Sequence, residues 1–549
     1  MFHAAHCVVT LRSSEAYDSI AVLKLHFGVS DICRTLFFLL FLQMKKTKLS
    51  IMKRSRILLT GATGTMGMAG LREIHARKER FDLTLLVRPS RKNRRIIKPY
   101  LNCDNIRIVW GDLRNYNDVL SAVEGADYVL HVGGMVSPAA DHYPIETMQV
   151  NTLAAQNIVQ AVKAQPNPDE IKVVYIGSVA QTGDRPAPFH WARTGDPIAP
   201  SVFDYYAISK CIAERIFAES GLKYWVSLRQ SGILYAGILR NIDPIMFHVP
   251  IREVLEWTTV EDSGRLLANI CEESVPDSFW RKFYNIGSGA EYRLTNYCFE
   301  QLLLKNSLGL PPEKLFASNM FATRNFHGQW YLDSDKLEDI LHFRAGTPVE
   351  EYFAGLQKQL PWFFALAKYV PAGIMRLFLR YLAHHKRFGT LGWIKQDDKT
   401  HIAAYFGSRE EWENIPEWQT IANFSPAGES DAELLNHGYN EQKPTDKLNL
   451  EDMQQAATFR GGKCLSNKMN EGDLYTPLEW ECACGHHFKA TPTVILLGGH
   501  WCPKCFSQPW QYDAEAKRNP FFAQLWLKHH TGENNDYSSS VIDISNFTK

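Results

Sequence analysis

A serine, a tyrosine and a lysine stand out in this 549-residue chain because their types and spacing suit proton transfer. Tyr206 and Lys210 lie four residues apart in a stretch of helical character that runs to Glu219, so their side chains can share one face. A phenol has a pKa of about 10 in water, so at neutral pH it stays protonated and cannot accept a proton. A neighbouring ammonium would stabilise the phenolate, so Tyr206 is predicted to accept a proton. Ser178 follows a buried run, where its hydroxyl can bond a substrate oxygen.

A glycine-rich segment precedes these residues. Gly61-Ala62-Thr63-Gly64-Thr65-Met66-Gly67 stands between the apolar run that ends at Thr60 and a helix-like stretch that reaches Arg80. Glycine allows a tight turn close to a pyrophosphate, and a helix N-terminus supplies N–H groups and positive dipole. The segment therefore predicts a dinucleotide site. A bound cationic nicotinamide would add to the effect of Lys210 on the phenol.

The residues after the second predicted strand distinguish the two nicotinamide cofactors. A carboxylate there holds the ribose hydroxyls of NAD, whereas a cation accommodates the extra phosphate of NADP. Arg88 stands at this position, in Val87-Arg88-Pro89-Ser90-Arg91-Lys92, so the sequence favours NADP, with NAD as the alternative. A solvated basic loop is the other interpretation of this run.

Short apolar runs alternate with helical stretches from Arg54 onward, which predicts βαβ units and a Rossmann-type, doubly wound parallel sheet with a smaller substrate-binding part. Helices are expected at 150–163 and 349–360, and strand material recurs near Phe283. The predicted strands are Ile57–Leu59, Leu83–Val87, Ile106–Trp110, Tyr128–Val132 and Ile171–Ile176.

Taken together, these motifs resemble the extended short-chain dehydrogenase/reductase family, the NAD(P)-dependent epimerase/dehydratase group, over about Lys53 to Gln359. The resemblance implies that Ser178, Tyr206 and Lys210 form the active triad and that Asp112 and Leu113 lie near the adenine. It also implies pairing of two copies through helices. The fourth-strand motif is His131-Val132-Gly133-Gly134, with glycines where alanines are more usual. Further matching segments are Gly111-Asp112-Leu113, Val150-Asn151-Thr152, Ala213-Glu214, Leu228-Arg229, Tyr284–Gly289 and Asp333-Ser334-Asp335-Lys336.

Three functions fit this resemblance. Family members that act on nucleotide sugars, as epimerases or dehydratases, oxidise a hydroxyl and return the hydride. Many of them carry an asparagine close to the position of Gly232, where it contacts the substrate diphosphate. A glycine here keeps open an NADPH-dependent carbonyl reductase or a hydroxysteroid-type dehydrogenase. A non-catalytic nucleotide-sensing protein is the third interpretation, although the complete triad argues against it.

A cysteine cluster lies nearer the C-terminus. The two motifs are Cys482-Ala483-Cys484-Gly485-His486 and Cys502-Pro503-Lys504-Cys505, and the 17 residues between Cys484 and Cys502 are a spacing typical of zinc ribbons. The predicted ligands of a structural Zn²⁺ are Cys482, Cys484, Cys502 and Cys505, with His486 as the alternative to Cys484 because the first pair is unusually tight. Free thiols beside Trp480 and Trp501 are the other interpretation.

The remaining sequence sets the expected domains. We expect an N-terminal extension at 1–51, the enzyme domain at 52–370, a helical segment and linker at 371–450, a zinc-ribbon-like module at 451–520 and a polar tail at 521–549. The apolar run 36–43 is shorter than the about 20 residues that cross a bilayer. Segment 374–381 has helical apolar spacing, which favours a helix packed on the enzyme domain over one on a membrane surface or a partner helix.

Composition narrows the class of protein. Lys plus Arg number 60 and Asp plus Glu 59. This balance argues against the strong positive field of proteins that coat nucleic acids, so no nucleic-acid partner is required. The six cysteines outside 464–505 are scattered, which is typical of reduced thiols and predicts a cytoplasmic protein. The family resemblance implies a small-molecule substrate.

Overall fold

The computed structural model of the protein describes residues 54–240, 242–538, 542–544 and 547. The chain divides into two units, Met1–Arg54 and Ser55–Lys549, and the fold below is that of the second unit. The predicted N-terminal extension and its apolar run 36–43 lie outside the described residues. Among the residues that are described, no helix is both long and apolar enough to cross a bilayer.

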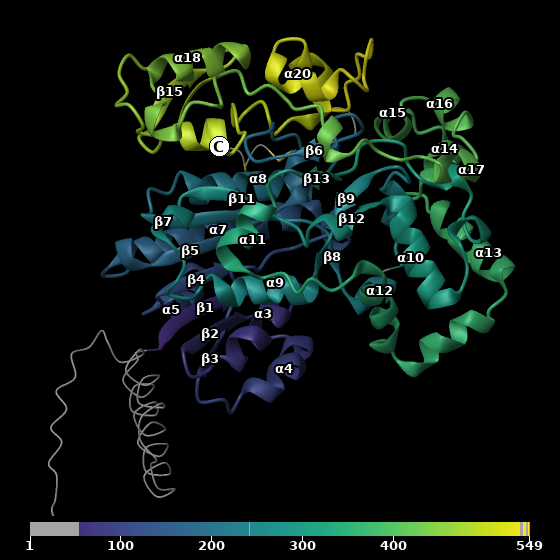
Figure 1. Ribbon diagram of the computed structural model, residues 1–549, viewed down its shortest axis with the longest axis horizontal. Helices are drawn as coiled ribbons and strands as arrows, with labels where there is room; N and C mark the ends of the chain where they lie inside the picture. Colours follow the sequence, from purple (N-terminus) through teal and green to yellow (C-terminus); the bar gives the residue numbers. More distant parts are fainter. Residues whose placement is uncertain (1–53, 241, 539–541, 545–546, 548–549) are drawn as a thin grey trace, which may run out of the picture. The chain divides into compact units, whose positions relative to one another are not determined.

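A seven-stranded sheet forms the centre of this unit (Figure 1). All its strands run parallel, in the spatial order β11-β7-β5-β4-β1-β2-β3, which confirms the predicted Rossmann-type sheet. The strands are β1 (Ser55–Thr60), β2 (Phe81–Val87), β3 (Ile106–Trp110), β4 (Tyr128–His131), β5 (Lys172–Ser178), β7 (Tyr224–Gln230) and β11 (Lys282–Ile286).

The two faces of the sheet are buried under different helices, because successive side chains of a strand point to opposite faces. In β1, Ile57 and Leu59 belong to one core and Leu58 to the other. The first core is covered by α3 (Thr65–Ala76), α4 (Arg91–Ile97), α9 (Val260–Asn269) and α11 (Asp335–Leu341). The second is covered by α5 (Tyr116–Val123), α7 (Pro144–Lys163) and α8 (Tyr205–Ala218).

Short strand pairs and two helices form the smaller part, most of which follows β7 in the chain. Each pair has only two or three residues per strand, and the helices pack on a separate core that includes Leu234 and Phe353. These elements are β6 (Trp191–Ala192) with β13 (Trp330–Tyr331), β8 (Ile233–Leu234) with β10 (Thr258–Thr259), β9 (Val254–Glu256) with β12 (Arg293–Thr295), α10 (Asn296–Leu308) and α12 (Val349–Lys358).

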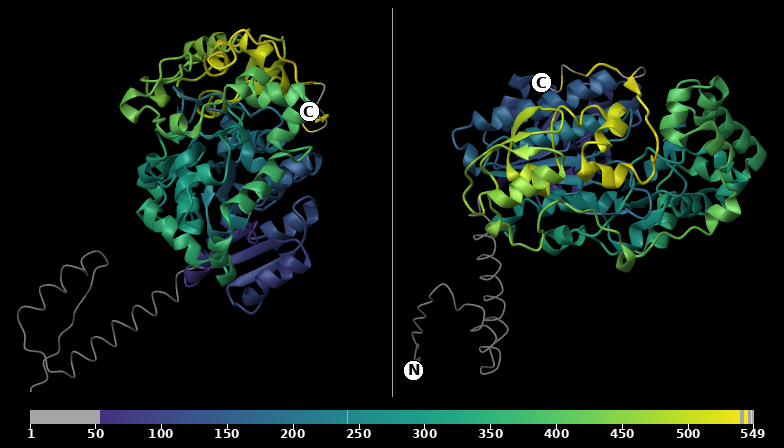
Figure 2. Two further views of the ribbon diagram at one scale, coloured as in Figure 1. Left: turned by 90° about the vertical axis from the view of Figure 1, so that its right-hand side faces the viewer. Right: turned by 90° about the horizontal axis from the view of Figure 1, so that it is seen from above.

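A group of short helices occupies residues 362–422 and lies beside α10, away from the seven-stranded sheet (Figures 1 and 2). Its members are η10 (Trp362–Tyr369), α13 (Ala372–Ala383), α14 (Thr390–Gln396), α15 (Lys399–Phe406), α16 (Arg409–Glu413) and α17 (Trp418–Ala422).

The C-terminal part contains a three-stranded antiparallel sheet of β14 (Lys463–Cys464), β15 (Leu478–Glu481) and β16 (His487–Ala490), preceded by α18 (Leu450–Phe459). It lies over the side of the unit where α8 and β11 are found (Figures 1 and 2).

Two segments are more ordered than their sequences predict. The expected polar tail contains α20 (Pro520–Trp526), whose Phe522 and Trp526 are buried in one core with Tyr205 at the start of α8. The expected linker also has buried members: His437 Nε2 lies 2.8 Å from a carboxylate oxygen of Asp196. The boundaries at 370, 450 and 520 remain predictions.

A buried ion pair connects α8, β7 and the C-terminal part. Glu214 accepts hydrogen bonds from Arg229 Nη2 at 2.7 Å and from the Ser227 hydroxyl at 2.6 Å. His500 Nε2 lies 2.8 Å from Glu214 Oε1, and Arg229 also donates to the carbonyl of Gly498 at 2.6 Å. Burial alone would raise the pKa of Glu214, but the charge of Arg229 and the His500 hydrogen bond hold that pKa below its ordinary value.

We predict that Glu214→Gln lowers the free energy of unfolding by about 3–5 kcal/mol, because it leaves the buried guanidinium of Arg229 without a counter-charge. Chemical denaturation followed by tryptophan fluorescence measures the loss. The matched control is Glu471→Gln, which breaks the exposed pair of Glu471 with Lys447 and should leave the midpoint nearly unchanged. Equal midpoints for both variants would contradict this account.

Candidate functional site

The glycine segment forms a tight turn between β1 and α3. Gly61 has φ +73°, a backbone conformation that side chains rarely adopt, and a Cβ on it would come within 2.7 Å of Gly133 Cα. A Cβ on Gly67 would come within 2.1 Å of the Gly61 carbonyl oxygen. Both glycines are therefore required by close backbone packing, as the sequence motif predicts.

The N-terminus of α3 has no protein cap. Gly64 is the N-cap residue, no side chain bonds the first N–H groups, and no acidic residue lies in the first turn. By contrast, α8 is capped by Asp204, which accepts from the Ala207 N–H at 2.8 Å. The free N–H groups and positive end of α3 suit an anionic group such as a pyrophosphate.

The fourth-strand glycines bring the end of β4 against this turn. Gly133 donates its N–H to the Thr60 hydroxyl at 2.9 Å, and a Cβ on Gly133 would lie 2.9 Å from Leu113. A Cβ on Gly134 would lie 2.8 Å from Asn151 Oδ1 and 3.8 Å from Lys210 Nζ. The alanines usual in the resembling family would not fit here without a shift, which explains both glycines.

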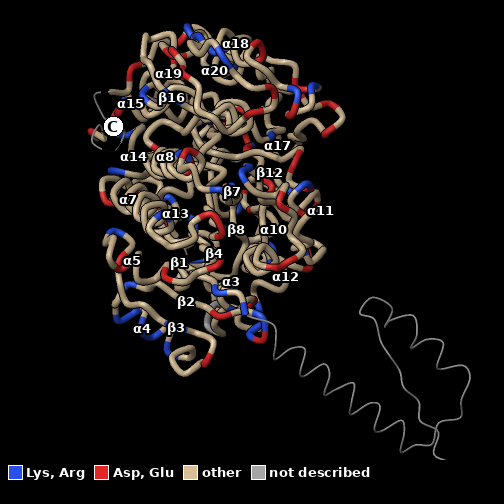
Figure 3. Tube along the Cα trace, turned by 90° about the vertical axis from the view of Figure 1, so that its left-hand side faces the viewer, with Lys and Arg blue, Asp and Glu red and all other residues tan. Residues whose placement is uncertain are grey.

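Asp112 and Arg88 follow neighbouring strands of the sheet. Asp112 accepts from Arg114 Nη2 at 2.8 Å, and this side-chain hydrogen bond lowers the pKa of Asp112 against the opposing effect of burial. The charge of Arg88 also reaches Asp112, and the Arg88 side chain is exposed. Further Lys and Arg residues of α4 gather beside β3 (Figure 3).

The structure brings Ser178, Tyr206 and Lys210 together at the carboxyl end of β5. The Ser178 side chain hydrogen-bonds the Tyr206 hydroxyl. Lys210 Nζ lies 5.9 Å from the centre of the Tyr206 ring and donates to the Ile176 carbonyl at 2.8 Å. Lys210 also lies beside Gly134, and the preceding residue, Gly133, is the one that packs against Gly61 of the glycine turn.

The acidity of Tyr206 differs from the prediction. Burial raises the pKa of Tyr206 to about 12, although the hydrogen bond with Ser178 acts in the other direction. Burial also lowers the pKa of Lys210 to about 8, against the attraction of Glu214. Without a bound cationic ring, the ammonium therefore does not overcome the cost of desolvating a phenolate.

Two positioning residues were not identified from the sequence. Asn151 accepts from the Met135 N–H at 2.8 Å and donates to the Ser209 hydroxyl at 2.8 Å, which ties the segment after β4 to α8. Gln181 Oε1 accepts from the Ser178 N–H at 2.7 Å. Asn151 stands in a motif that matched the family, but no local pattern indicated its partner.

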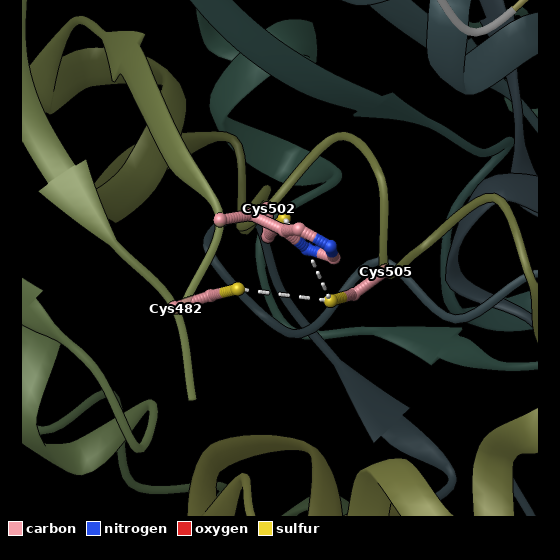
Figure 4. Close-up of side chains that lie close together, drawn as sticks. Cys482, Cys502 and Cys505 are labelled. Carbon is pink, nitrogen blue, oxygen red and sulfur yellow. Dashed lines mark hydrogen bonds between the residues drawn. The ribbon is translucent and has the colours of Figure 1, made fainter. Parts of the chain in front are cut away.

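The cysteine cluster gathers four donors: Cys482, His486, Cys502 and Cys505, with all ligand atoms within 4.8 Å of one another. Figure 4 shows the thiols of Cys482 and Cys505 facing each other. Cys484 is exposed and lies outside this group, with its Sγ 3.6 Å from Cys505 Sγ. The geometry thus favours the alternative donor, His486, over Cys484.

The spacing of these donors matches a tetrahedral zinc ion. Zn–S bonds of about 2.3 Å and Zn–N bonds of about 2.0–2.1 Å give tetrahedron edges of about 3.8 Å between sulfurs and about 3.5–3.6 Å between sulfur and nitrogen. Cys482 Sγ and Cys505 Sγ are 3.8 Å apart, and His486 Nδ1 is 3.5 Å from both Cys502 Sγ and Cys505 Sγ. These three of the six edges of the donor group have the lengths that a tetrahedral zinc ion requires.

Comparison with known sequences finds a match to the NAD dependent epimerase/dehydratase family at residues 57–231. The UDP-glucose 4-epimerase of Rickettsia bellii (strain RML369-C) is 32% identical over 109 residues, which cover 19% of this chain and 32% of the relative. The enzyme of the same description from Rickettsia felis is 30% identical over 112 residues, with the same coverage. The chain thus spans about a third of the length of these curated relatives.

Among solved structures, the dTDP-glucose 4,6-dehydratase of Bacillus anthracis in complex with NAD has a TM-score of 0.45 and 15% sequence identity. That likeness covers 55% of this chain and 96% of the other. The UDP-glucose 4-epimerase of Thermus thermophilus in complex with NAD has a TM-score of 0.41 and 19% identity, over 58% of this chain and 99% of the other.

We predict that the purified protein carries about one zinc ion per chain and that Cys484→Ala keeps it, whereas His486→Ala loses it, because only His486 completes the four-donor group. Elemental analysis of both alanine variants measures the difference. Zinc retained by His486→Ala and lost by Cys484→Ala would contradict the assignment.

Proposed function

We propose that this chain belongs to the NAD dependent epimerase/dehydratase family, whose model matches residues 57–231, and that it is an NADP-using oxidoreductase with Tyr206, Ser178 and Lys210 as its catalytic residues. One observation carries the proposal. The hydrogen-bonded Ser178–Tyr206 pair and the Lys210 ammonium lie beside the glycine turn, next to a helix N-terminus that no side chain caps.

The residues of the turn fit a dinucleotide. The N–H groups of Thr65 and Met66 lie at the start of α3 and that of Thr63 in the turn before it, and Gly61, Gly64 and Gly67 add no side chains to this turn. Asp112 and Leu113 would border the adenine, and His131, Val132 and Gly133 would line the cofactor at the end of β4. When bound, the nicotinamide accepts or supplies a hydride and carries positive charge in its oxidised form.

Arg88 supports NADP over NAD. It stands at the end of β2, where a 2′-phosphate would lie, and its side chain is exposed. Arg114 is the second cation close to Asp112. A guanidinium can hold a phosphate through two parallel hydrogen bonds.

Tyr206 moves the proton in this mechanism. Its hydroxyl donates to, or accepts from, the substrate oxygen, while Ser178 bonds the same oxygen and fixes its position. Lys210 stabilises the phenolate by charge and orients the cofactor. Because the pKa of Tyr206 is about 12 without cofactor, the bound cofactor and Lys210 must stabilise the phenolate enough to lower that pKa before Tyr206 can act as a base at neutral pH.

The substrate class has two candidates. Membership of the epimerase/dehydratase family, together with the partial likeness to UDP-glucose 4-epimerases, supports a nucleotide sugar. The packing at Gly232 favours the second candidate, net reduction of a smaller carbonyl compound. A Cβ there would come within 2.7 Å of both Leu255 and Trp257, so the diphosphate-contacting asparagine would not fit at this position.

Tyr206→Phe tests the chemistry. We predict that it lowers turnover by about 10²–10⁴-fold, the usual contribution of general acid–base catalysis, and leaves cofactor affinity within a few-fold of the wild type. The measurement is NADPH oxidation with panels of carbonyl compounds and the interconversion of UDP- and GDP-sugars. Tyr205→Phe is the matched control, because the Tyr205 hydroxyl bonds the Ile542 N–H and faces away from the pair. Unchanged turnover in Tyr206→Phe would contradict the role of Tyr206, whereas a wild type that binds NADPH and turns over no compound in either panel would support the nucleotide-sensing alternative.

Arg88→Asp tests the cofactor. We expect the ratio of Michaelis constants for NADPH and NADH to rise at least about tenfold, because the carboxylate repels the 2′-phosphate and can bond the ribose hydroxyls of NADH. Arg91→Asp places the same charge change in the first turn of α4 and should move the ratio much less. Equal effects of the two variants would indicate that Arg88 makes no specific contact with the 2′-phosphate and belongs to a solvated basic loop.

A further inference from the structure

Helix α13 has apolar residues on two opposite faces. Its inner face packs on a core that includes Phe247 and Phe321 of the unit. The residues of α13 in this core are Ala372, Met375, Leu379, Leu382 and Ala383. This face, together with hydrogen bonds from Arg376 to the carbonyls of Glu313 and Lys314, attaches the helix to the rest of the unit.

The outer face is equally apolar but exposed. Ile374, Leu377, Phe378 and Tyr381 follow the i, i+3, i+4, i+7 spacing of one helical face. Leu377 is 71% and Tyr381 75% exposed. The helix thus packs on the unit as its spacing predicts, but through other residues of α13 and not through these four.

The preceding segment η10 extends this surface. Tyr369 is 83% exposed, and Trp362, Leu366 and Val370 are exposed too. Such a concentration of exposed large apolar side chains is uncommon on a soluble monomer and marks an interaction site. We call the exposed apolar residues of 362–381 the outer apolar surface.

The segment that carries the outer apolar surface has formal charge of one sign. Between Tyr352 and Gln396 the sequence contains no Asp or Glu, and its Lys and Arg residues are Lys358, Lys368, Arg376, Arg380, Lys386, Arg387 and Lys395. Arg380 lies on the exposed side of α13, and Lys386 and Arg387 are exposed just after it. A chain with a net charge of only +1 thus places a strongly cationic segment beside its most exposed apolar residues.

We propose that the outer apolar surface docks on the surface of an anionic lipid bilayer. Aliphatic residues together with Trp and Tyr, flanked by Lys and Arg, form the composition that lies at a membrane interface and attracts acidic headgroups. A second copy of this chain fits less well, since a symmetric contact would bring like charges together. The inference is independent of the proposed function and would bring the enzyme to substrates that are held at, or released from, a membrane.

Vesicle flotation of the full-length protein tests the proposal. Vesicles of phosphatidylcholine with a third of phosphatidylglycerol should carry the protein upward in the gradient, and vesicles of phosphatidylcholine alone should carry much less. Binding should weaken as salt is raised, because the headgroup attraction is screened. Leu377→Glu/Tyr381→Glu should reduce binding to the acidic vesicles at least about tenfold, because it removes apolar area and adds negative charge.

The matched control is Leu101→Glu/Leu434→Glu, which changes two exposed leucines outside the outer apolar surface. It should bind like the wild type, and all variants should keep the wild-type melting temperature. The proposal is overturned if the wild type floats with neither vesicle, or if both double variants float equally. It is also overturned if sedimentation equilibrium shows a dimer that only Leu377→Glu/Tyr381→Glu dissociates, since the surface would then join two copies.

Discussion

The close approach of two backbone turns is the constraint on which the candidate site depends. Gly61 after β1 and Gly133 after β4 lie so near each other that a methyl group on either would collide with the other turn or with Leu113. The uncapped N-terminus of α3 follows this contact at the carboxyl end of β1, and Gly134, next to Gly133, lies beside Lys210. One packing requirement therefore sets both the anion-binding end of a helix and the distance from it to the Ser178–Tyr206 pair.

Buried charge also stabilises the position of α8, the helix that carries Tyr206 and Lys210. Lys210 and Glu214 lie one turn apart on α8, and Glu214 bonds Arg229 of β7 and His500 of the C-terminal part. The C-terminal part is thus joined to the elements that carry Tyr206 and Lys210, and the four-donor cluster lies in this same part. A zinc ion there would stabilise the sheet β14–β16, which contacts α8 through Arg215 and Phe488. The cluster would then have a structural role that does not require contact with substrate.

Much of this architecture could be predicted from local patterns. The bounds of β3 agree to the residue, and the Ser178, Tyr206 and Lys210 side chains meet as their motif indicates. What the sequence could not show depends on contacts between distant segments. The raised pKa of Tyr206 follows from burial, the partner of Asn151 is Ser209 on another helix, and the tail around Trp526 is buried only because the start of α8 offers an apolar surface. Likewise, spacing alone predicted Cys484 as the ligand with His486 as the alternative, and only the fold of the loop favours His486.

The central claim is that the glycine turn and the tyrosine–lysine pair serve one bound nicotinamide dinucleotide. A crystal structure of the full-length protein with NADPH tests it most directly, through the distance from the nicotinamide C4 atom to the Tyr206 hydroxyl. The account predicts a pyrophosphate on the N–H groups at the start of α3 and a nicotinamide ring in van der Waals range of Tyr206, with Lys210 bonded to the adjoining ribose. A dinucleotide bound elsewhere, or one whose ring points away from Tyr206, would contradict it.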